Sequence, residues 1–361
     1  MTDEGLPDAQ RQAPANDAER GSASAQEAAR PRRRFLAQLK YIEPIWLLTA
    51  MAVVLIVTGV IVALSIVGLP QASDGWASLP EDASVTVNLA GYFPAEGEAP
   101  LAKPLGIALL GSRVYVAESD AARVAIFDVR GRRTGEIVLE IAEGADLAVP
   151  TVLAPAGSRR LAVLDAAAGQ VLVYDVPWLW SGPGLDFRIG EGDPATAPVR
   201  PTAVTYDAGS FYVADAESAS IKVYDDDGTF IREMGADLES PLGYVGGMVV
   251  AGDRLVLAES GADRVLSLGL APGEQPVVFP DAYSLPRGVC SVGDGIAVTA
   301  VLGGGICVCG PDGVRTHVID AETVPAWPPS GPEGAAFLER NDRLYVTEPD
   351  FGRVVVFNVR M

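Results

Sequence analysis

The sequence predicts an all-β fold, a six-bladed β-propeller with four-stranded blades, preceded by one transmembrane α-helix. Three observations lead to this prediction. A hairpin-like motif recurs six times at the spacing of a propeller blade, an unpaired strand pattern precedes the first repeat, and a long uncharged apolar run lies near the N-terminus. Internal repeats are treated first because they decide the fold.

The repeat is clearest in RVYVAESDAARVAIFD (113–128), where two β-branched apolar runs flank a short polar turn. Such a pattern is typical of a β-hairpin. Versions of it occupy 160–175, 210–225, 254–269, 295–310 and 343–358, of which 295–310 is the most divergent. After most hairpins one more apolar run follows, as at 135–141, 229–235 and 314–319.

A proline introduces a short apolar run before each hairpin, usually with a glycine two residues later. These prolines lie 46, 51, 40, 45 and 46 residues apart, at Pro104, Pro150, Pro201, Pro241, Pro286 and Pro332. Such an interval is the period of a four-stranded propeller blade. We therefore expect strands A, B, C and D, counted outward from the axis, in each of six blades.

The last repeat ends at Met361, straight after its third strand, so it lacks a fourth strand of its own. An unpaired strand pattern, SVTVNLAGYF, lies at 84–93, before the first blade. We expect this segment to supply the outer strand of blade six and to close the ring, which would cover an edge prone to aggregation.

These motifs resemble the NHL-repeat family of six-bladed propellers over about residues 84–361. The matching features are the Pro-x-Gly entry, strand ends such as Tyr212-Val213-Ala214-Asp215, and Arg-Val-x-x-Phe-Asp at 123–128. The family's usual Asn-His or Asn-Arg pair before strand C is mostly missing. The propeller prediction rests on the repeat spacing and does not depend on this resemblance.

The residues before the propeller suggest a membrane anchor. Residues 1–40 form a polar tail, expected to be disordered and cytoplasmic, which ends in a basic cluster; 41–69 hold the expected transmembrane helix, and 70–83 a linker to the propeller at 84–361. The uncharged run 45–67 would span about 35 Å as a helix. A cleaved signal peptide is the competing interpretation, but its apolar core would be shorter, at about 7–15 residues.

Charge predicts the orientation and the kind of partner. Five basic residues lie within 30–40, a short distance before the span, and none occurs between the span and Lys103, so we expect a cytoplasmic N-terminus, a single-pass anchor in the cell membrane and an extracytoplasmic propeller. Residues 71–361 hold 20 basic against 40 acidic residues. This acidity should repel nucleic acid and anionic lipid, and it also serves the solubility of an exported domain.

An acid closes strand B in five of the six repeats, and Thr299 stands there in the divergent copy. The acids are Glu118, Asp165, Asp215, Glu259 and Glu348. They should form a ring on the face that also carries the D-to-A connections. Arginine follows five residues later in three blades, which favours a structural role in holding the hairpin together, with ligand binding as the alternative.

Catalytic and metal sites find little support in the sequence. The only histidine, His317, falls on an expected outer strand, so neither a histidine-based zinc or copper site nor a Ser-His-Asp arrangement is expected. No cofactor is predicted. Calcium remains an alternative through Asp225 and Asp227, although their Asp-Asp-Asp-Gly segment is more typical of a turn between strands C and D.

Tryptophans mark two further candidate surfaces. Trp178 and Trp180 lie in an insertion, VPWLWSGPG (176–184), and Trp327 lies in the connection before blade six. Tryptophan is enriched at interface hot spots, although the insertion would equally fold back over its own blade. The sequence therefore favours a membrane-anchored binding or scaffolding module with a protein partner in or at the membrane. The alternative is a lactonase- or lyase-like enzyme or sensor that uses a carboxylate-bound divalent cation in the channel.

Overall fold

The computed structural model describes residues 85–95, 97–142, 146–177, 182–281, 283–303 and 305–360. The expected cytoplasmic tail, the apolar run 45–67 and the tryptophans Trp178 and Trp180 lie outside these residues. Within the described ranges, no helix is long and apolar enough to cross a membrane.

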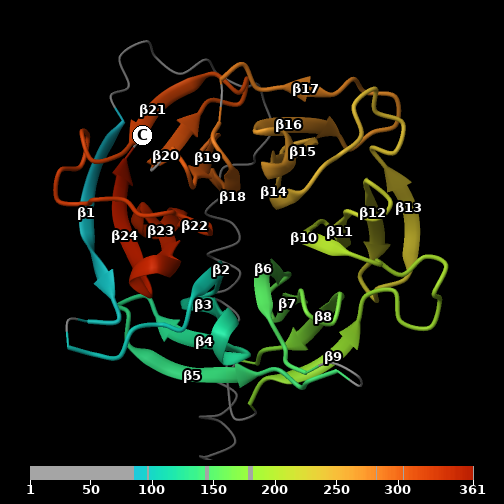
Figure 1. The fold of residues 1–361 in the computed structure, drawn as a ribbon, viewed down its shortest axis with the longest axis horizontal. Coiled ribbons are helices and arrows are strands. Elements are labelled where there is room, and N and C mark those ends of the chain that lie inside the picture. Colours follow the sequence, from blue (N-terminus) through green and yellow to red (C-terminus); the bar gives the residue numbers. More distant parts are fainter. Residues whose placement is uncertain are drawn as a thin grey trace, which may run out of the picture. The chain divides into compact units, whose positions relative to one another are not determined.

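Six four-stranded antiparallel sheets surround a common axis (Figure 1). The strands of blades one to three are β2 (Pro104–Leu110), β3 (Arg113–Glu118), β4 (Arg123–Asp128) and β5 (Arg133–Val138); β6 (Pro150–Ala156), β7 (Arg160–Asp165), β8 (Gln170–Asp175) and β9 (Gly184–Arg188); and β10 (Pro201–Asp207), β11 (Ser210–Asp215), β12 (Ser220–Asp225) and β13 (Phe230–Met234). Those of blades four to six are β14 (Val245–Ala251), β15 (Arg254–Glu259), β16 (Arg264–Gly269) and β17 (Val277–Val278); β18 (Pro286–Val292), β19 (Gly295–Ala300), β20 (Gly305–Cys309) and β21 (Arg315–Ile319); and β22 (Ala335–Leu338), β23 (Arg343–Glu348), β24 (Arg353–Arg360) and β1 (Thr86–Phe93). The all-β six-bladed propeller predicted from the repeats is thereby confirmed.

The closing strand is also confirmed. β1 pairs antiparallel with β24, from Thr86 opposite Arg360 to Phe93 opposite Val354, and gives blade six the order β1-β24-β23-β22. β1 forms the outer edge of this blade in Figure 1. Strands from both ends of the propeller sequence therefore share one sheet, which holds the ring closed.

The core is divided among the six junctions between neighbouring blades. Each cluster of buried apolar side chains combines residues from two adjacent sheets; one, for example, contains Tyr115 of β3 and Val163 of β7. Strands B and C are buried on both faces because each sheet is sandwiched between two others. This explains their nearly continuous apolar sequence.

The glycines of the Pro-x-Gly entries allow close approach of the inner strands. A Cβ atom on Gly106 would lie 2.6 Å from the carbonyl oxygen of Thr151 in the next blade, and one on Gly334 would lie 2.5 Å from that of Leu105. Gly288 is equally confined. The motif is therefore a packing requirement of the ring.

The structure corrects one strand boundary. Strand A of blade four begins at Val245, four residues after Pro241, and Gly247 takes the place of the entry glycine, since its Cβ would lie 2.4 Å from the Arg287 oxygen. The Pro241-Leu242-Gly243 motif instead forms part of the preceding connection. The amide of Gly243 donates a hydrogen bond there to the side chain of Glu259 at the end of strand B.

Candidate functional site

The D-to-A connections and the B-to-C turns emerge on one face of the propeller, here called the connection face. The five acids that close strand B lie beneath this face and are 0–1% exposed: Glu118, Asp165, Asp215, Glu259 and Glu348. In the divergent blade, Ala300 pairs with Pro286 as Glu118 does with Pro104, so Ala300 occupies the acid position and Thr299 lies one residue earlier.

Each buried acid accepts a hydrogen bond from a backbone amide of the connection that enters its own blade. The pairs are Ala102 to Glu118 (3.0 Å), Val149 to Asp165 (2.9 Å), Arg200 to Asp215 (2.8 Å), Gly243 to Glu259 (2.6 Å) and Ser330 to Glu348 (3.2 Å). A carboxylate can accept several such bonds, so each acid fastens a D-to-A connection to strand B.

Basic side chains neutralise four of these acids. The sequence predicted partners for Glu118, Glu259 and Glu348, and the Nε atoms of Arg123, Arg264 and Arg353 lie 2.5–2.7 Å from the respective carboxylates. It missed Lys222, whose Nζ lies 3.1 Å from Asp215 Oδ2. Lys222 stands two residues beyond the usual arginine position, and strand alternation returns it to the same face.

Trp327, a candidate for a binding surface, is buried in blade six. Its side chain is 0% exposed, its Nε1 donates to Glu348 Oε1 over 2.9 Å, and its ring lies 4.9 Å from that of Phe357. The Glu348 carboxylate provides the acceptor that an indole N–H needs when buried. Trp327 therefore locks the last connection onto blade six.

The Asp225–Asp227 segment, the calcium alternative of the sequence, forms a turn between β12 and β13. Asp225 Oδ1 accepts the amides of Asp227 (3.1 Å) and Thr229 (2.8 Å), as the turn interpretation expects. Among the described residues, no three His, Cys, Asp or Glu side chains lie together as a metal site would require. His317 lies on the outer strand β21, as predicted.

Hydroxyl groups link neighbouring blades at four of the six junctions. Ser119 Oγ donates to the Pro150 oxygen, Thr299 Oγ1 to that of Glu333 and Thr347 Oγ1 to that of Leu105, each over 2.6 Å, and Ser260 Oγ donates to the Pro286 oxygen. After the acids of blades two and three the equivalents of Ser119 are Ala166 and Ala216. At the position of Thr347 these two blades have Leu164 and Ala214. None of these four residues has a hydroxyl to donate, so among the described residues this link is missing where blade two meets three and where three meets four.

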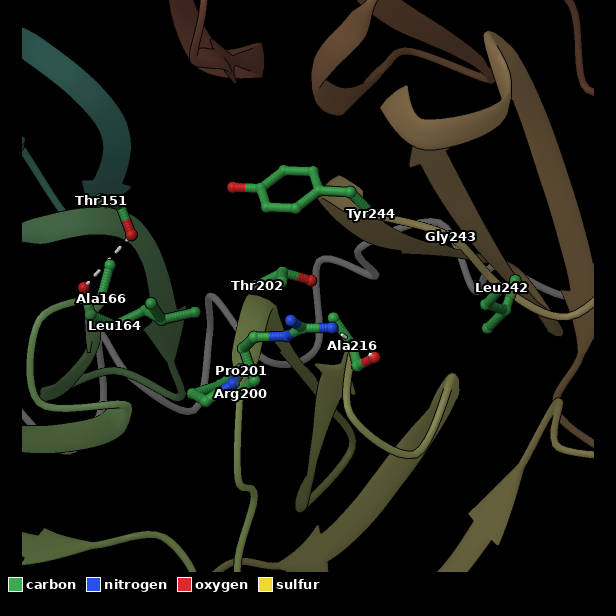
Figure 2. A pocket seen from close by; sticks show the side chains of 10 residues that line it. All are labelled: Thr151, Leu164, Ala166, Arg200, Pro201, Thr202, Ala216, Leu242, Gly243 and Tyr244. Atoms are coloured by element: carbon green, nitrogen blue, oxygen red, sulfur yellow. Dashed lines mark hydrogen bonds between the residues drawn. The ribbon is translucent and has the colours of Figure 1, made fainter.

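A pocket of about 410 Å³ opens at these two junctions (Figure 2). Ala166 and Ala216 line it together with Leu164, Pro201, Leu242 and two threonines. Thr202 is 6% exposed, and its Oγ1 has no hydrogen-bond partner in the structure. Arg200 extends along the same pocket and donates one hydrogen bond to the Ala216 oxygen, over 3.0 Å. The pocket is therefore apolar on its walls, with one cation and one unsatisfied hydroxyl.

A second cavity, of about 320 Å³, follows the axis and is lined by the inner strands. It shares Thr151 and Tyr244 with the first pocket, so the two adjoin. Lys103, Arg287 and Glu333 also line it. Arg287 Nε lies 3.6 Å from Glu333 Oε2, which is an ion pair without a hydrogen bond, and this buried Nε has no hydrogen-bond partner.

Aromatic and electrostatic contacts connect the side chains that line the axial cavity. The Arg287 guanidinium lies 5.1 Å from the centre of the Tyr244 ring, within cation–π range. Burial raises the pKa of Glu333, although the nearby charges of Arg287 and Lys103 act in the opposite direction. Two cations therefore face one carboxyl group around the axial cavity.

Two of the buried acids should make stability depend on pH. Burial alone would raise the pKa of Glu118 and Asp215, but their hydrogen bonds and basic neighbours outweigh it and leave the pKa lowered. A lowered pKa stabilises the fold above the unfolded-state pKa of about 4, and this contribution is lost as pH falls through the folded-state value. We expect the free energy of unfolding, measured by urea denaturation, to decrease below about pH 5.

Glu118→Gln tests the origin of this decrease. Its stability should lie below that of the native protein at pH 7 and approach it towards pH 3, because the native carboxylate loses its advantage on protonation. Glu339→Gln, on an exposed turn of the opposite face, provides the control. Parallel pH profiles for Glu118→Gln and the native protein would contradict the assignment.

Comparison with known proteins identifies the fold only. No protein-family model and no curated protein sequence matches the chain. Similar solved structures include a streptogramin B lyase, with a TM-score of 0.53 and 14% sequence identity, where the match covers 76% of this chain and 98% of that chain. Virginiamycin B lyase from Staphylococcus aureus has a TM-score of 0.52 and 14% identity, with 76% of this chain and 99% of that chain covered. A protein of unknown function from Bacteroides thetaiotaomicron is also similar (TM-score 0.51, 14% identity, 77% of this chain and 76% of that chain). At this identity the likeness defines the class, a six-bladed β-propeller, and nothing about activity.

Proposed function

We propose that the protein is a membrane-anchored propeller of the NHL-repeat type that binds a protein partner in or at the membrane, with its connection face as the binding surface. The observation that carries this proposal is a group of exposed apolar side chains on that face. Val199 is 63% exposed, Leu302 77%, Phe351 48% and Tyr244 43%.

These side chains come from the connections and turns of blades three to six, and one of them, Tyr244, lines the axial cavity. Loops carried by a rigid scaffold are the usual place for binding residues. Exposed aromatic and large apolar groups are also what a partner would desolvate at a hot spot. In this proposal the buried acids and Trp327 act indirectly, by holding the loops of the connection face in place.

The membrane part of the proposal rests on the sequence. The uncharged run 45–67 follows a cluster of five basic residues at 30–40, and a short linker separates it from the propeller. Such an anchor would keep the propeller at the outer membrane surface and would raise the effective concentration of a partner in the same membrane.

Site-specific photo-crosslinking of the full-length protein in intact cells tests the binding surface. A photoreactive amino acid at Leu302 or Phe351 should yield the same crosslinked partner. The same probe at Val314, which is 49% exposed in a turn of the opposite face, should not. Equal products from all three positions, or none from any, would contradict binding through the connection face.

A further inference from the structure

We propose that the pocket between blades two, three and four is a binding site for a small organic carboxylate with an apolar body. Arg200 and Thr202 would hold the carboxylate, and Leu164, Pro201 and Leu242 would contact the body. This inference is independent of the protein partner proposed above.

The pocket is a local departure from the repeat. Ser119 and Ser260 follow the acids of blades one and four, and their hydroxyls reach the neighbouring blade, whereas Ala166 and Ala216 stand at this position in blades two and three and line the pocket. Blades two and three also carry Val152 and Ala203 where the other four blades have the confined entry glycine. Both departures fall on the same two blades, which places the pocket at one sector of the connection face.

The polar side chains of the pocket form only some of the hydrogen bonds that they are able to form. Thr202 is more than nine-tenths buried, yet its hydroxyl has no hydrogen-bond partner in the described part of the chain. An unsatisfied buried hydroxyl is costly, and a bound ligand that offers an acceptor would remove this cost. Arg200 gives one hydrogen bond to Ala216, and no carboxylate among the described residues forms an ion pair with it.

The local charge favours an anion although the whole chain has a net charge of −20. Among the described residues that line the pocket, Arg200 is the only charged one, and Lys103 and Arg287 lie around the adjoining cavity, opposed by Glu333. Arginine pairs with carboxylates in a bidentate manner. The apolar walls and a volume of about 410 Å³ suit a compact organic molecule, since ligand pockets commonly measure about 300–1,000 Å³.

Ligand-observed NMR with the full-length protein in detergent provides the test. The probes are 4-phenylbutanoate, its neutral counterpart 4-phenyl-1-butanol, and acetate, which retains the carboxylate without the apolar body. We expect 4-phenylbutanoate to bind with a dissociation constant in the millimolar range or tighter. The alcohol and acetate should each bind at least about tenfold more weakly, because each lacks one of the two recognised parts.

Two substitutions remove the polar contacts with little risk to folding. Arg200→Gln should weaken the binding of 4-phenylbutanoate about 10- to 100-fold, since a charged hydrogen bond is lost. Thr202→Val should weaken it less, while leaving the melting temperature unchanged or higher, because the hydroxyl has no partner in the free protein. Arg340→Gln removes the same charge from an exposed turn of the opposite face and should have no effect.

A third substitution fills the pocket. Ala216→Ser places a hydroxyl at the position that Ser119 and Ser260 occupy in their blades, so it should strengthen the junction and reduce the affinity for 4-phenylbutanoate. Loss of 4-phenylbutanoate binding in Arg200→Gln but not in Arg340→Gln would support the site. Absence of binding to the native protein up to 20 mM, taken as roughly the weakest affinity of interest, or equal binding of the acid and the alcohol, would overturn it.

Discussion

Phe93→Ala is expected to lower the free energy of unfolding by about 3–5 kcal/mol, the usual cost of emptying a buried phenylalanine site. Phe93 ends β1, the strand that closes the ring, and is 4% exposed. Its ring lies 4.9 Å from that of Phe127 in blade one and 6.4 Å from that of Tyr345 in blade six. The substitution therefore weakens both the closing strand and the junction that it covers. Urea denaturation followed by circular dichroism would measure the loss.

Val87→Ala provides the matched control, because Val87 belongs to the same strand but is only partly buried. It should cost about 1 kcal/mol or less. If Phe93→Ala were no more damaging than Val87→Ala, the closing strand would contribute its hydrogen bonds and little packing. The importance assigned to the contact between blades one and six would then be incorrect.

The closing strand was predictable because it follows from counting. Six repeats with one missing outer strand and one unpaired strand pattern leave a single economical arrangement, and β1 occupies it. Strands B and C were also placed closely, since the hairpin pattern reads directly from β-branched residues around a polar turn. The hairpin at 113–128, for example, became β3 and β4 with the same outer limits.

Two assignments were wrong because a sequence motif did not coincide with the pairing of the strands in the structure. Pro241 resembles the other entry prolines, yet strand A of blade four begins at Val245, and the amide of the intervening Gly243 donates to the Glu259 side chain. Thr299 was assigned to the acid position, but each acid lies five residues after the start of its repeat, and the same count from Gly295 gives Ala300. The pairing of Ala300 with Pro286 agrees with this count. The sequence alone could therefore have corrected this offset of one residue.

The pocket could not be predicted because it depends on hydroxyl groups that blades two and three lack. Ala166 and Ala216 attract no notice in the sequence, and their meaning appears only when the serines and threonines of the other blades are seen to cross between blades. Trp327 shows the opposite case. Its residue type suggested a surface, but the Glu348 carboxylate gave its N–H a partner inside the fold, which only the tertiary structure reveals.

Glu348→Ala is expected to be the second severe substitution, with a loss of about 3–5 kcal/mol in the free energy of unfolding. The carboxylate accepts bonds from Trp327 Nε1 (2.9 Å), the Ser330 amide (3.2 Å) and Arg353 Nε (2.6 Å). All three donors would lose their acceptor, and the indole N–H is buried. Since the Arg353 side chain is 22% exposed, water would partly solvate its charge, and we expect the lower end of the range.

A double-mutant cycle with Arg353→Met separates the ion pair from the other two bonds. The Arg353 guanidinium lies over the rings of Tyr92 and Phe351, at 4.1 and 4.3 Å, and methionine retains part of this packing. The double variant should be more stable than the sum of the single losses predicts, by about 1 kcal/mol or more, because no unpaired charge remains.

Glu259→Ala in blade four supplies the comparison, since Glu259 binds Arg264 and the Gly243 amide without a tryptophan. If Glu348→Ala lowered the free energy of unfolding no more than Glu259→Ala does, the role given to Trp327 would be contradicted. If the losses of the two single variants in the cycle simply added, the role given to the ion pair would be contradicted.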